Sequence, residues 1–122
     1  MTTVDVTKTT FDATITDNAI VLIDFWAAWC GPCRMFAPTF TAASERHSDI
    51  FFAKVDTEAE QELAAAANIR SIPTLMAFRD KILVFSQPGA LNSSSLEEAI
   101  SSIRSLDMDD VRASISSKQV AS

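Results

Sequence analysis

A run of apolar residues from Ile20 to Trp26, interrupted only by Asp24, constrains the fold of this chain more than any other feature of its sequence. Both alternating sets of side chains in the run are apolar, and branched and aromatic types predominate. A strand with one face in water would alternate apolar and polar residues, so this pattern predicts a central strand that is covered on both sides.

The segments around this strand alternate between helical and strand patterns. Apolar residues recur at helical spacing in residues 7–16, in the segment after Pro32, and after two capping-box pairs, Thr57 with Glu60 and Ser94 with Glu97. Short apolar runs predict further strands at residues 50–55, 74–78 and 82–86, the last two as an antiparallel hairpin. The resulting order of elements predicts an α/β fold, a sandwich with a mixed sheet.

The length and charge of the chain limit its domain organisation and its partners. A chain of 122 residues can bury one core without disulfides or structural metals, and its formal net charge of −6 argues against nucleic acid as a partner. The composition changes only after Leu106, where the sequence becomes rich in Ser and Asp and has no aromatic residue. We therefore expect one domain over residues 1–106 and a C-terminal tail over residues 107–122.

The tail carries one weak structural signal. Met108, Val111 and Ile115 would share one face of a short amphipathic helix. A frayed terminal segment, docking on the body of the protein and binding of a partner are all compatible with this pattern.

The N-terminus and the longest apolar stretch indicate where the protein works. Residues 1–5 lack the basic start and the apolar stretch of a signal peptide, and residues 19–29, interrupted by Asp24, are too short to span a membrane. We expect a cytoplasmic protein that makes no membrane contact. In that compartment the two cysteines are more typical of catalysis or metal binding than of a structural disulfide.

The two cysteines, Cys30 and Cys33, lie between the central strand and the helix after Pro32. Residues i and i+3 in the first turn of a helix have their Cα atoms close enough to form a disulfide without distortion. The helix start also offers free N–H groups and a positive dipole end, which favour a thiolate at Cys30. The pair is therefore predicted to open and close reversibly.

Two other interpretations of the cysteine pair are weaker. A tetrahedral zinc site needs four ligands, and this chain offers one pair and a lone histidine, His47, which is expected to be exposed. A cluster shared between two chains is the form of metal binding that the sequence leaves open. An inert pair of core cysteines would not explain why Gly31, Pro32 and Trp29 lie next to them.

The sequence Trp29-Cys30-Gly31-Pro32-Cys33 follows Asp24-Phe25-Trp26-Ala27, and Ile72-Pro73-Thr74 lies downstream. This set resembles the bacterial type of the thioredoxin family, and the resemblance spans roughly residues 5–106. It implies the thioredoxin fold, a central mixed β-sheet with helices on both faces. It also implies a thiol–disulfide oxidoreductase, a protein-disulfide reductase that serves electron transport and cell redox homeostasis.

The resemblance further implies the partners and cofactors. The protein would act as a monomer, bind no cofactor or metal, and reduce target proteins that contain disulfides. Its own redox-active disulfide, Cys30–Cys33, would be recharged by a thioredoxin reductase that uses NADPH, because the chain has no nucleotide-binding signature of its own. Gly31 and Pro32 are expected to tune the redox potential toward reduction of targets.

Four residues carry the catalytic roles that the resemblance implies. Cys30 would attack a target disulfide as a thiolate, and Cys33 would resolve the resulting mixed disulfide. Asp24, six residues before Cys30, would act as the base for Cys33, since its apolar flanks predict a burial that raises its pKa. Lys54 matches the lysine that neighbours this carboxylate in the family.

A groove for target proteins is implied around Cys30. Pro73 matches the cis-proline of the family, beside which the backbone of Ile72 can pair with an extended target peptide. Trp26 is expected to support the site by packing. The groove residues would be Trp29, Ile72, Pro73, Gly89 and Ala90.

The chain departs from the family pattern at three places. The hairpin turn has Asp80-Lys81 in place of a glycine-containing pair, so it must avoid a second left-handed residue or bear strain. Pro88 stands where a branched apolar residue is usual, and the tail has no counterpart in a short member of the family. A rival interpretation is a binding module that uses the groove without turnover, although the presence of both cysteines weighs against it.

Overall fold

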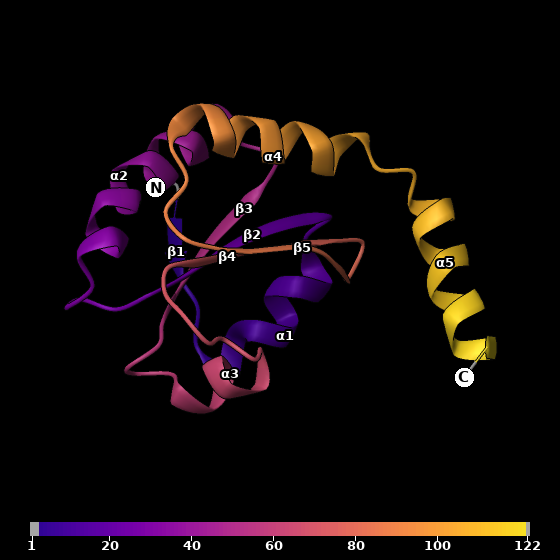
Figure 1. Cartoon of the computed structure of the whole chain (residues 1–122), viewed down its shortest axis with the longest axis horizontal. Coiled ribbons are helices and arrows are strands. Elements are labelled where there is room, and N and C mark those ends of the chain that lie inside the picture. The colour runs from indigo at the N-terminus through magenta and orange to yellow at the C-terminus, as the bar shows by residue number, and fades with distance from the viewer. Residues whose placement is uncertain (1–2, 122) are drawn as a thin grey trace.

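The computed structural model describes residues 3–121, which form one five-stranded mixed sheet and five helices (Figure 1). The strands are β1 (Thr3–Asp5), β2 (Ile20–Trp26), β3 (Phe51–Asp56), β4 (Thr74–Arg79) and β5 (Ile82–Pro88). They lie side by side in the order β1-β3-β2-β4-β5. The first three strands are parallel, whereas β4 runs antiparallel to β2 and β5 runs antiparallel to β4.

Strand β2 lies in the middle of the sheet, paired with β3 on one side and with β4 on the other. Its residues Val21, Leu22, Ile23 and Phe25 have no exposed surface. The prediction of a central strand covered on both faces is therefore confirmed. The sequence pattern missed β1, because three residues are too few to show an alternation.

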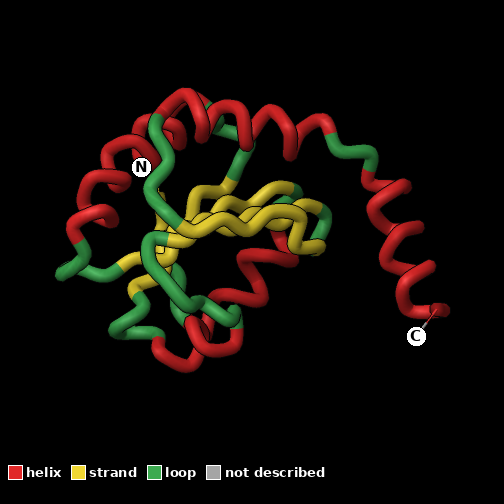
Figure 2. Tube along the Cα trace, in the orientation of Figure 1, coloured by secondary structure: helices red, strands yellow, loops and turns green. Residues whose placement is uncertain are grey.

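Helices cover both faces of the sheet (Figure 2). Helices α1 (Lys8–Asp17) and α3 (Gln61–Ala66) lie on one face, and α2 (Gly31–Arg46) and α4 (Ser93–Ser105) lie on the other. The fifth helix, α5 (Met108–Ala121), stands apart from the sheet at the C-terminal end. The predicted α/β fold with a mixed sheet between helices is confirmed. None of the helices within residues 3–121 has the length and apolar character needed to cross a membrane.

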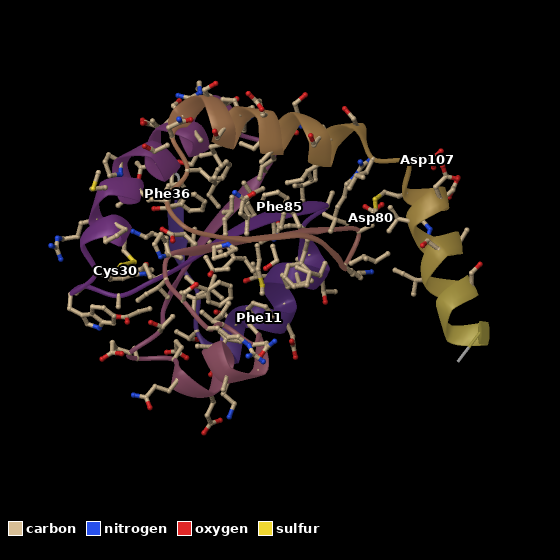
Figure 3. The ribbon with its side chains drawn as sticks, in the orientation of Figure 1. Phe11, Cys30, Phe36, Asp80, Phe85 and Asp107 are labelled. Carbon is tan, nitrogen blue, oxygen red and sulfur yellow. A yellow bond between two sulfur atoms is a disulfide. The ribbon has the colours of Figure 1, made fainter. Side chains whose placement is uncertain are left out.

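Each face of the sheet packs against its own apolar core, and Figure 3 shows Phe36 and Phe11 on opposite sides of the sheet. The core under α2 and α4 includes Leu22, Phe36, Phe40, Phe52, Leu96, Ile100 and Ile103. The core against α1 and α3 includes Ile15, Val21, Ile23, Phe25, Val55 and Leu63. Alternate residues of β2 thus enter different cores, which explains why both of its faces are apolar.

The helix starts differ from the predicted capping boxes. Helix α3 begins at Gln61, and Thr57 does not cap it, since the hydroxyl of Thr57 donates to the carbonyl of Trp26 (3.0 Å). Helix α4 is capped by Asn92, whose side-chain oxygen accepts the N–H of Ser95 (2.8 Å). Both predicted capping boxes are wrong, although both helices are present.

His47, at the end of α2, is half-buried, so the prediction that it is exposed is wrong. Its Nε2 lies 2.8 Å from a carboxylate oxygen of Glu97, and its Nδ1 lies 3.0 Å from the guanidinium of Arg104. Arg46 also donates to Glu97 (2.8 Å), and this bond, with a smaller contribution from His47, lowers the pKa of Glu97. The prediction failed because these partners of His47 lie on α4, far along the chain.

Asp80 and Lys81 form the turn between β4 and β5, with φ values of 51° and 70°. A two-residue hairpin loop of this kind requires two left-handed residues, and here both carry a Cβ atom. Of the two alternatives that the sequence left open, the structure therefore contains the strained turn. The Asp80 N–H donates to the carbonyl of Ala19 (2.9 Å), which holds the turn against the end of α1.

Replacing Lys81 with glycine is expected to raise the free energy of unfolding by about 0.5–1 kcal/mol, because glycine adopts a positive φ without steric cost. Urea denaturation of the oxidised protein measures the change. Lys81→Ala is the matched control, since it removes the same charge and keeps the Cβ atom, and it should not stabilise. Equal stability of the two variants would contradict the claim that the turn is strained.

Candidate active site

Cys30 and Cys33 form a disulfide across the first turn of α2, with their Cα atoms 5.2 Å apart. Cys30 caps the helix, and its Sγ accepts the backbone N–H of Cys33 at 3.2 Å. Pro32 suits the first turn because it has no N–H to leave unpaired and its φ is fixed near the helical value. The helix therefore begins at the cysteine pair, as predicted. Within residues 3–121, no group of three or more His, Cys, Asp or Glu side chains could hold a metal ion.

The helix start gives Cys30 an electrostatic environment unlike that of an ordinary thiol. Backbone N–H groups of the first turn have no partner inside the helix, and the positive end of the helix dipole lies at the same place. Both stabilise negative charge on sulfur, so the reduced form of Cys30 is favoured as a thiolate. The nearby Arg34 is held by a bond from its guanidinium to the carbonyl of Ala28 (2.8 Å).

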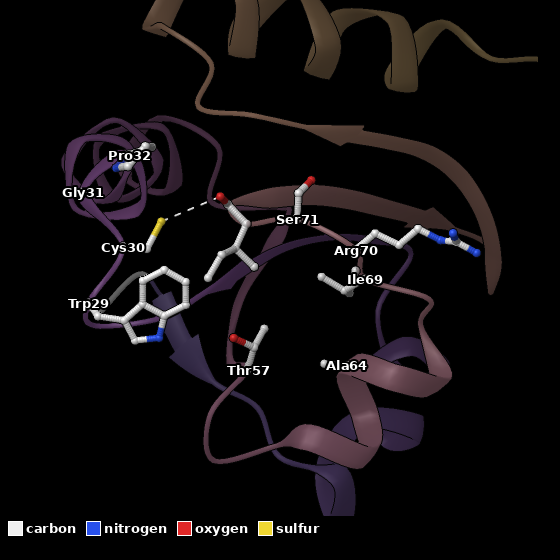
Figure 4. A pocket seen from close by; sticks show the side chains of 10 residues that line it. Trp29, Cys30, Gly31, Pro32, Thr57, Ala64, Ile69, Arg70 and Ser71 are labelled. Atoms are coloured by element: carbon white, nitrogen blue, oxygen red, sulfur yellow. Dashed lines mark hydrogen bonds between the residues drawn. The ribbon is translucent and has the colours of Figure 1, made fainter.

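Cys30 opens onto an apolar hollow of about 470 Å³, which we call the Cys30 groove (Figure 4). Cys33 does not line this groove, and Trp29, with 68% of its surface exposed, forms one wall. A target sulfur can therefore approach Cys30 more readily than Cys33. The lining residues are Trp29, Cys30, Gly31, Pro32, Thr57, Ala64, Ile69, Arg70, Ser71 and Ile72.

The loop before β4 forms another wall of the Cys30 groove. The peptide bond between Ile72 and Pro73 is cis, in agreement with the resemblance, and Pro73 is buried. The carbonyl oxygen of Ile72 lies 3.7 Å from the Sγ of Cys30, as the dashed line in Figure 4 shows. A backbone carbonyl therefore lies directly beside the sulfur that faces the groove.

Gly89 and Ala90 are exposed and lie outside the lining of the Cys30 groove. Gly89 is tied to the site through its N–H, which donates to the carbonyl of Pro73 (2.8 Å). Its φ of 99° would strain any residue with a Cβ atom. The role of Gly89 and Ala90 in target binding stays a prediction.

Half of the groove lining was not found by sequence reasoning. Thr57 and Ala64 lie in the turn after β3 and in α3, and Ile69, Arg70 and Ser71 form the loop that leads to the cis bond. No motif in their local sequence points to the groove, since their position beside Cys30 results from the folding of distant segments. The one available signal was the closeness of the last three residues to Ile72 in the sequence.

Asp24 is the one charged side chain of β2, and it has no exposed surface. Neither of its carboxylate oxygens has a hydrogen-bond partner among the residues that the structure describes. Burial disfavours the ionised form and raises the pKa of Asp24 to about 7, although the positive charge of Lys54 acts in the opposite direction. A carboxyl group with this pKa changes its protonation near neutrality, as a proton acceptor must.

Lys54 lies beside Asp24 because the two residues are register partners on neighbouring strands. Its Nζ lies 4.9 Å from the ring centroid of Trp26, a cation–π distance. Trp26 in turn packs against the cluster that contains the two cysteines. Lys54 thus adds a positive charge to the site without forming a hydrogen bond with the carboxyl group, which is why burial dominates the pKa of Asp24.

Asp24→Asn is expected to stabilise the protein, and more at pH 8 than at pH 5. In the folded protein Asp24 keeps its proton until about pH 7, whereas the unfolded chain releases it near pH 4, so the free energy of unfolding falls as pH rises between these values. Asparagine does not titrate, so the variant does not undergo this loss of unfolding free energy. The loss amounts to about 4 kcal/mol at most above pH 7. Guanidinium denaturation of the oxidised protein at both pH values measures it.

Asp12→Asn, on the exposed side of α1, is the control for the general effect of removing one negative charge. It should change the stability little at either pH. A gain for Asp24→Asn that does not grow between pH 5 and pH 8 would contradict the raised pKa.

Comparison with known proteins identifies one family with these features. The thioredoxin family model matches residues 2–102. A protein described as putative thioredoxin 2 from Streptomyces coelicolor is 54% identical over 117 residues, which cover 96% of this chain and 87% of that protein. Thioredoxin 1 from Synechococcus elongatus is 41% identical over 97 residues, 78% of this chain and 91% of that protein.

Solved structures agree with these matches. A mutant thioredoxin from Halobacterium salinarum has a TM-score of 0.79 and 36% identity, covering 86% of this chain and 93% of its own. Mitochondrial thioredoxin 3 from Saccharomyces cerevisiae, in its oxidized form, has a TM-score of 0.76 and 32% identity, covering 81% and 93%. The match to the Streptomyces protein covers enough of this chain to extend into α5.

Proposed function

The chain belongs to the thioredoxin family, and we propose that its Cys30–Cys33 pair carries electrons from an NADPH-dependent thioredoxin reductase to disulfide-containing target proteins. As a member of this family, the protein is a thiol–disulfide oxidoreductase that reduces protein disulfides. The observation that carries the proposal is the disulfide at the start of α2, with Cys30 facing the groove.

The reduction of a target proceeds in two thiol–disulfide exchanges. The Cys30 thiolate attacks one sulfur of the target disulfide, the S–S bond of the target breaks, and the other target sulfur leaves as a thiolate that takes up a proton. Cys33 then attacks the Sγ of Cys30, which forms the Cys30–Cys33 disulfide and releases the second target thiol. Two electrons thus pass from the protein to the target, and the two protons of the new target thiols are balanced by the proton that Cys33 gives up and by one proton from solvent.

The side chains around the pair have distinct parts in this scheme. Asp24 takes the proton of Cys33, a role that its burial and its pKa of about 7 support. Lys54 limits the rise of that pKa through its positive charge. Gly31 and Pro32 tune the redox potential of the pair, and Trp26 supports the site by packing.

Target binding is assigned to the Cys30 groove. Trp29 supplies an exposed apolar wall, and the carbonyl of Ile72 offers a polar group with which an extended peptide backbone can pair. Pro73, Gly89 and Ala90 belong to the rim of this surface. A site built from apolar contacts and backbone pairing accepts many target sequences, as a general disulfide reductase requires.

The composition and the relatives also bear on where the protein works and what it binds. It acts as a cytoplasmic monomer that binds neither membranes nor nucleic acid, and its net charge of −6 supports the exclusion of nucleic acid. The bacterial relatives described as thioredoxins support the cytoplasmic location. NADPH is used by the partner reductase, and the redox-active disulfide is the only redox group that this chain needs.

Cys33→Ser is expected to trap target proteins as mixed disulfides on Cys30, because the first exchange proceeds and the second cannot. Non-reducing electrophoresis after incubation with oxidised insulin measures the trapped species. Cys30→Ser is the matched control, and it should trap little because Cys33 does not line the groove. Trapping by Cys30→Ser and not by Cys33→Ser would reverse the two roles.

Insulin reduction with NADPH and a bacterial thioredoxin reductase tests the proposed electron donor. The wild-type protein should turn over, and the Cys30→Ser/Cys33→Ser double variant should not. A double variant that kept the cellular function of the protein would contradict the catalytic proposal and favour a binding module.

The catalytic domain, in this proposal, ends at Leu106, and α5 is an accessory element. Residues 108–121 are helical, and Met108 is buried. The Arg79 guanidinium donates to the carbonyls of Ile103, Arg104 and Leu106 at 2.8–3.1 Å, which fixes the end of α4 and the connection to α5. These contacts place the junction beside the hairpin, at the opposite end of the molecule from Cys30 (Figure 3).

Truncation after Leu106 is expected to leave insulin reduction within about two-fold of the full chain, because the removed helix lies far from the groove. The free energy of unfolding should fall by about 1–2 kcal/mol, since the buried side chain of Met108 is lost. Turnover assays and urea denaturation of both proteins measure the two effects. A loss of most of the activity would contradict the proposed boundary.

A further inference from the structure

The Cys30 groove has a charged end. Among its described lining residues, Arg70 is the only one that carries a formal charge. A second hollow, of about 180 Å³, adjoins the same loop, and Ile69, Arg70 and Ser71 line both hollows. Arg70 is also the only charged residue among those lining the second hollow that the structure describes. The two hollows therefore adjoin at the loop that carries Arg70.

Arg70 differs from the other arginines of the chain in having no partner. Its side chain is exposed, and within residues 3–121 no hydrogen bond or ion pair engages its guanidinium. Figure 4 shows this side chain extending away from Cys30 at the far end of the groove. The other arginines donate to carboxylates or carbonyls: Arg34, Arg46, Arg79, Arg104 and Arg112.

The position of Arg70 along the loop fixes which part of a bound peptide it can reach. It precedes Ile72, the residue whose carbonyl lies beside Cys30, by two positions. The chain bends at Ser71 and Ile72, so Arg70 lies within roughly 7 Å of Ile72 along the loop, the reach of two fully extended residues. In a target segment that is itself extended, a side chain two residues from the reacting cysteine lies at about the same distance from that cysteine, which brings it within reach of the exposed Arg70 side chain.

We propose that Arg70 determines target specificity by favouring disulfides that have an Asp or Glu side chain about two residues from the attacked cysteine. The proposal rests on the proposed function, because it requires target peptides to occupy the Cys30 groove. A guanidinium can bind a carboxylate through two parallel hydrogen bonds. On a protein of net charge −6, which repels acidic segments in general, this cation supplies a local attraction at the groove.

Single-turnover reduction of synthetic peptides tests this specificity. Each peptide is closed by one disulfide, and the peptides differ only in carrying Glu, Gln or Lys two residues before one cysteine; a companion series carries the same residues two positions after it. The protein is reduced with dithiothreitol, freed from it and mixed with each peptide, and chromatography follows the released peptide thiols. The electrons come from the protein's own dithiol, so the result does not depend on a reductase.

In one of the two series, the wild-type protein should reduce the Glu peptide about two- to five-fold faster than the Lys peptide at low ionic strength. The ratio should fall toward one in roughly 0.5 M salt, because salt screens an exposed ion pair. Arg70→Gln should remove the preference, and Arg70→Glu should reverse it.

Lys81→Gln is the matched control, since it removes an exposed positive charge at the distant hairpin turn and should leave the Glu-to-Lys ratio unchanged. An unchanged ratio in Arg70→Glu would overturn the proposal. An equal change in Lys81→Gln would also overturn it, because the preference would then follow the net charge. Failure of the proposed function has a different signature, since no peptide, including the Gln peptide, would then be reduced.

Discussion

The burial of β2 on both faces determines where the charged and reactive groups of this protein can lie. Alternate side chains of the strand enter two separate cores, so any charged residue in it is cut off from water. Asp24 is that residue, and its raised pKa follows from its place in the strand. The same strand ends just before Cys30, where the chain leaves the sheet and begins α2. One buried strand therefore determines both the raised pKa of the Asp24 carboxyl group and the position of the sulfur pair.

Some features of the structure do not contribute to the stability of the folded state, and at least one lowers it. A buried carboxyl group without a hydrogen-bond partner lowers the stability of the folded state, and stability gives no reason for Asp24 to be there. The proposed transfer of a proton from Cys33 to this carboxyl group would supply that reason. Arg70 is a second such case on the surface, because it is the arginine that makes no hydrogen bond or ion pair with the residues that the structure describes. The strained turn at Asp80 and Lys81 has no such explanation in the chemistry of the site.

The parts of the fold that depend on local sequence could be predicted from it. The strand from Ile20 to Trp26, the hairpin and the helix that opens at the cysteine pair all follow from the spacing of apolar residues and from the two cysteines. The cis bond before Pro73 followed only from the resemblance, because no local signal distinguishes it from a trans bond. The features that were predicted wrongly depend on distant partners. His47 bonds to α4, and the hydroxyl of Thr57 donates to the end of β2. Arg70 lay outside every local motif for the same reason, since only the folded loop carries it to the groove.

The mechanism depends above all on the protonation of Asp24 near neutrality, which a carbon-13 NMR titration of the aspartate carboxyl groups measures. Comparison with Asp24→Asn assigns the signal, and titration of both the oxidised and the reduced protein shows whether the group is available when Cys33 carries its proton. We expect the Asp24 carboxyl group to titrate with a midpoint at about pH 7 in the oxidised protein. A midpoint near pH 4, the value of an ordinary exposed carboxyl group, would contradict it.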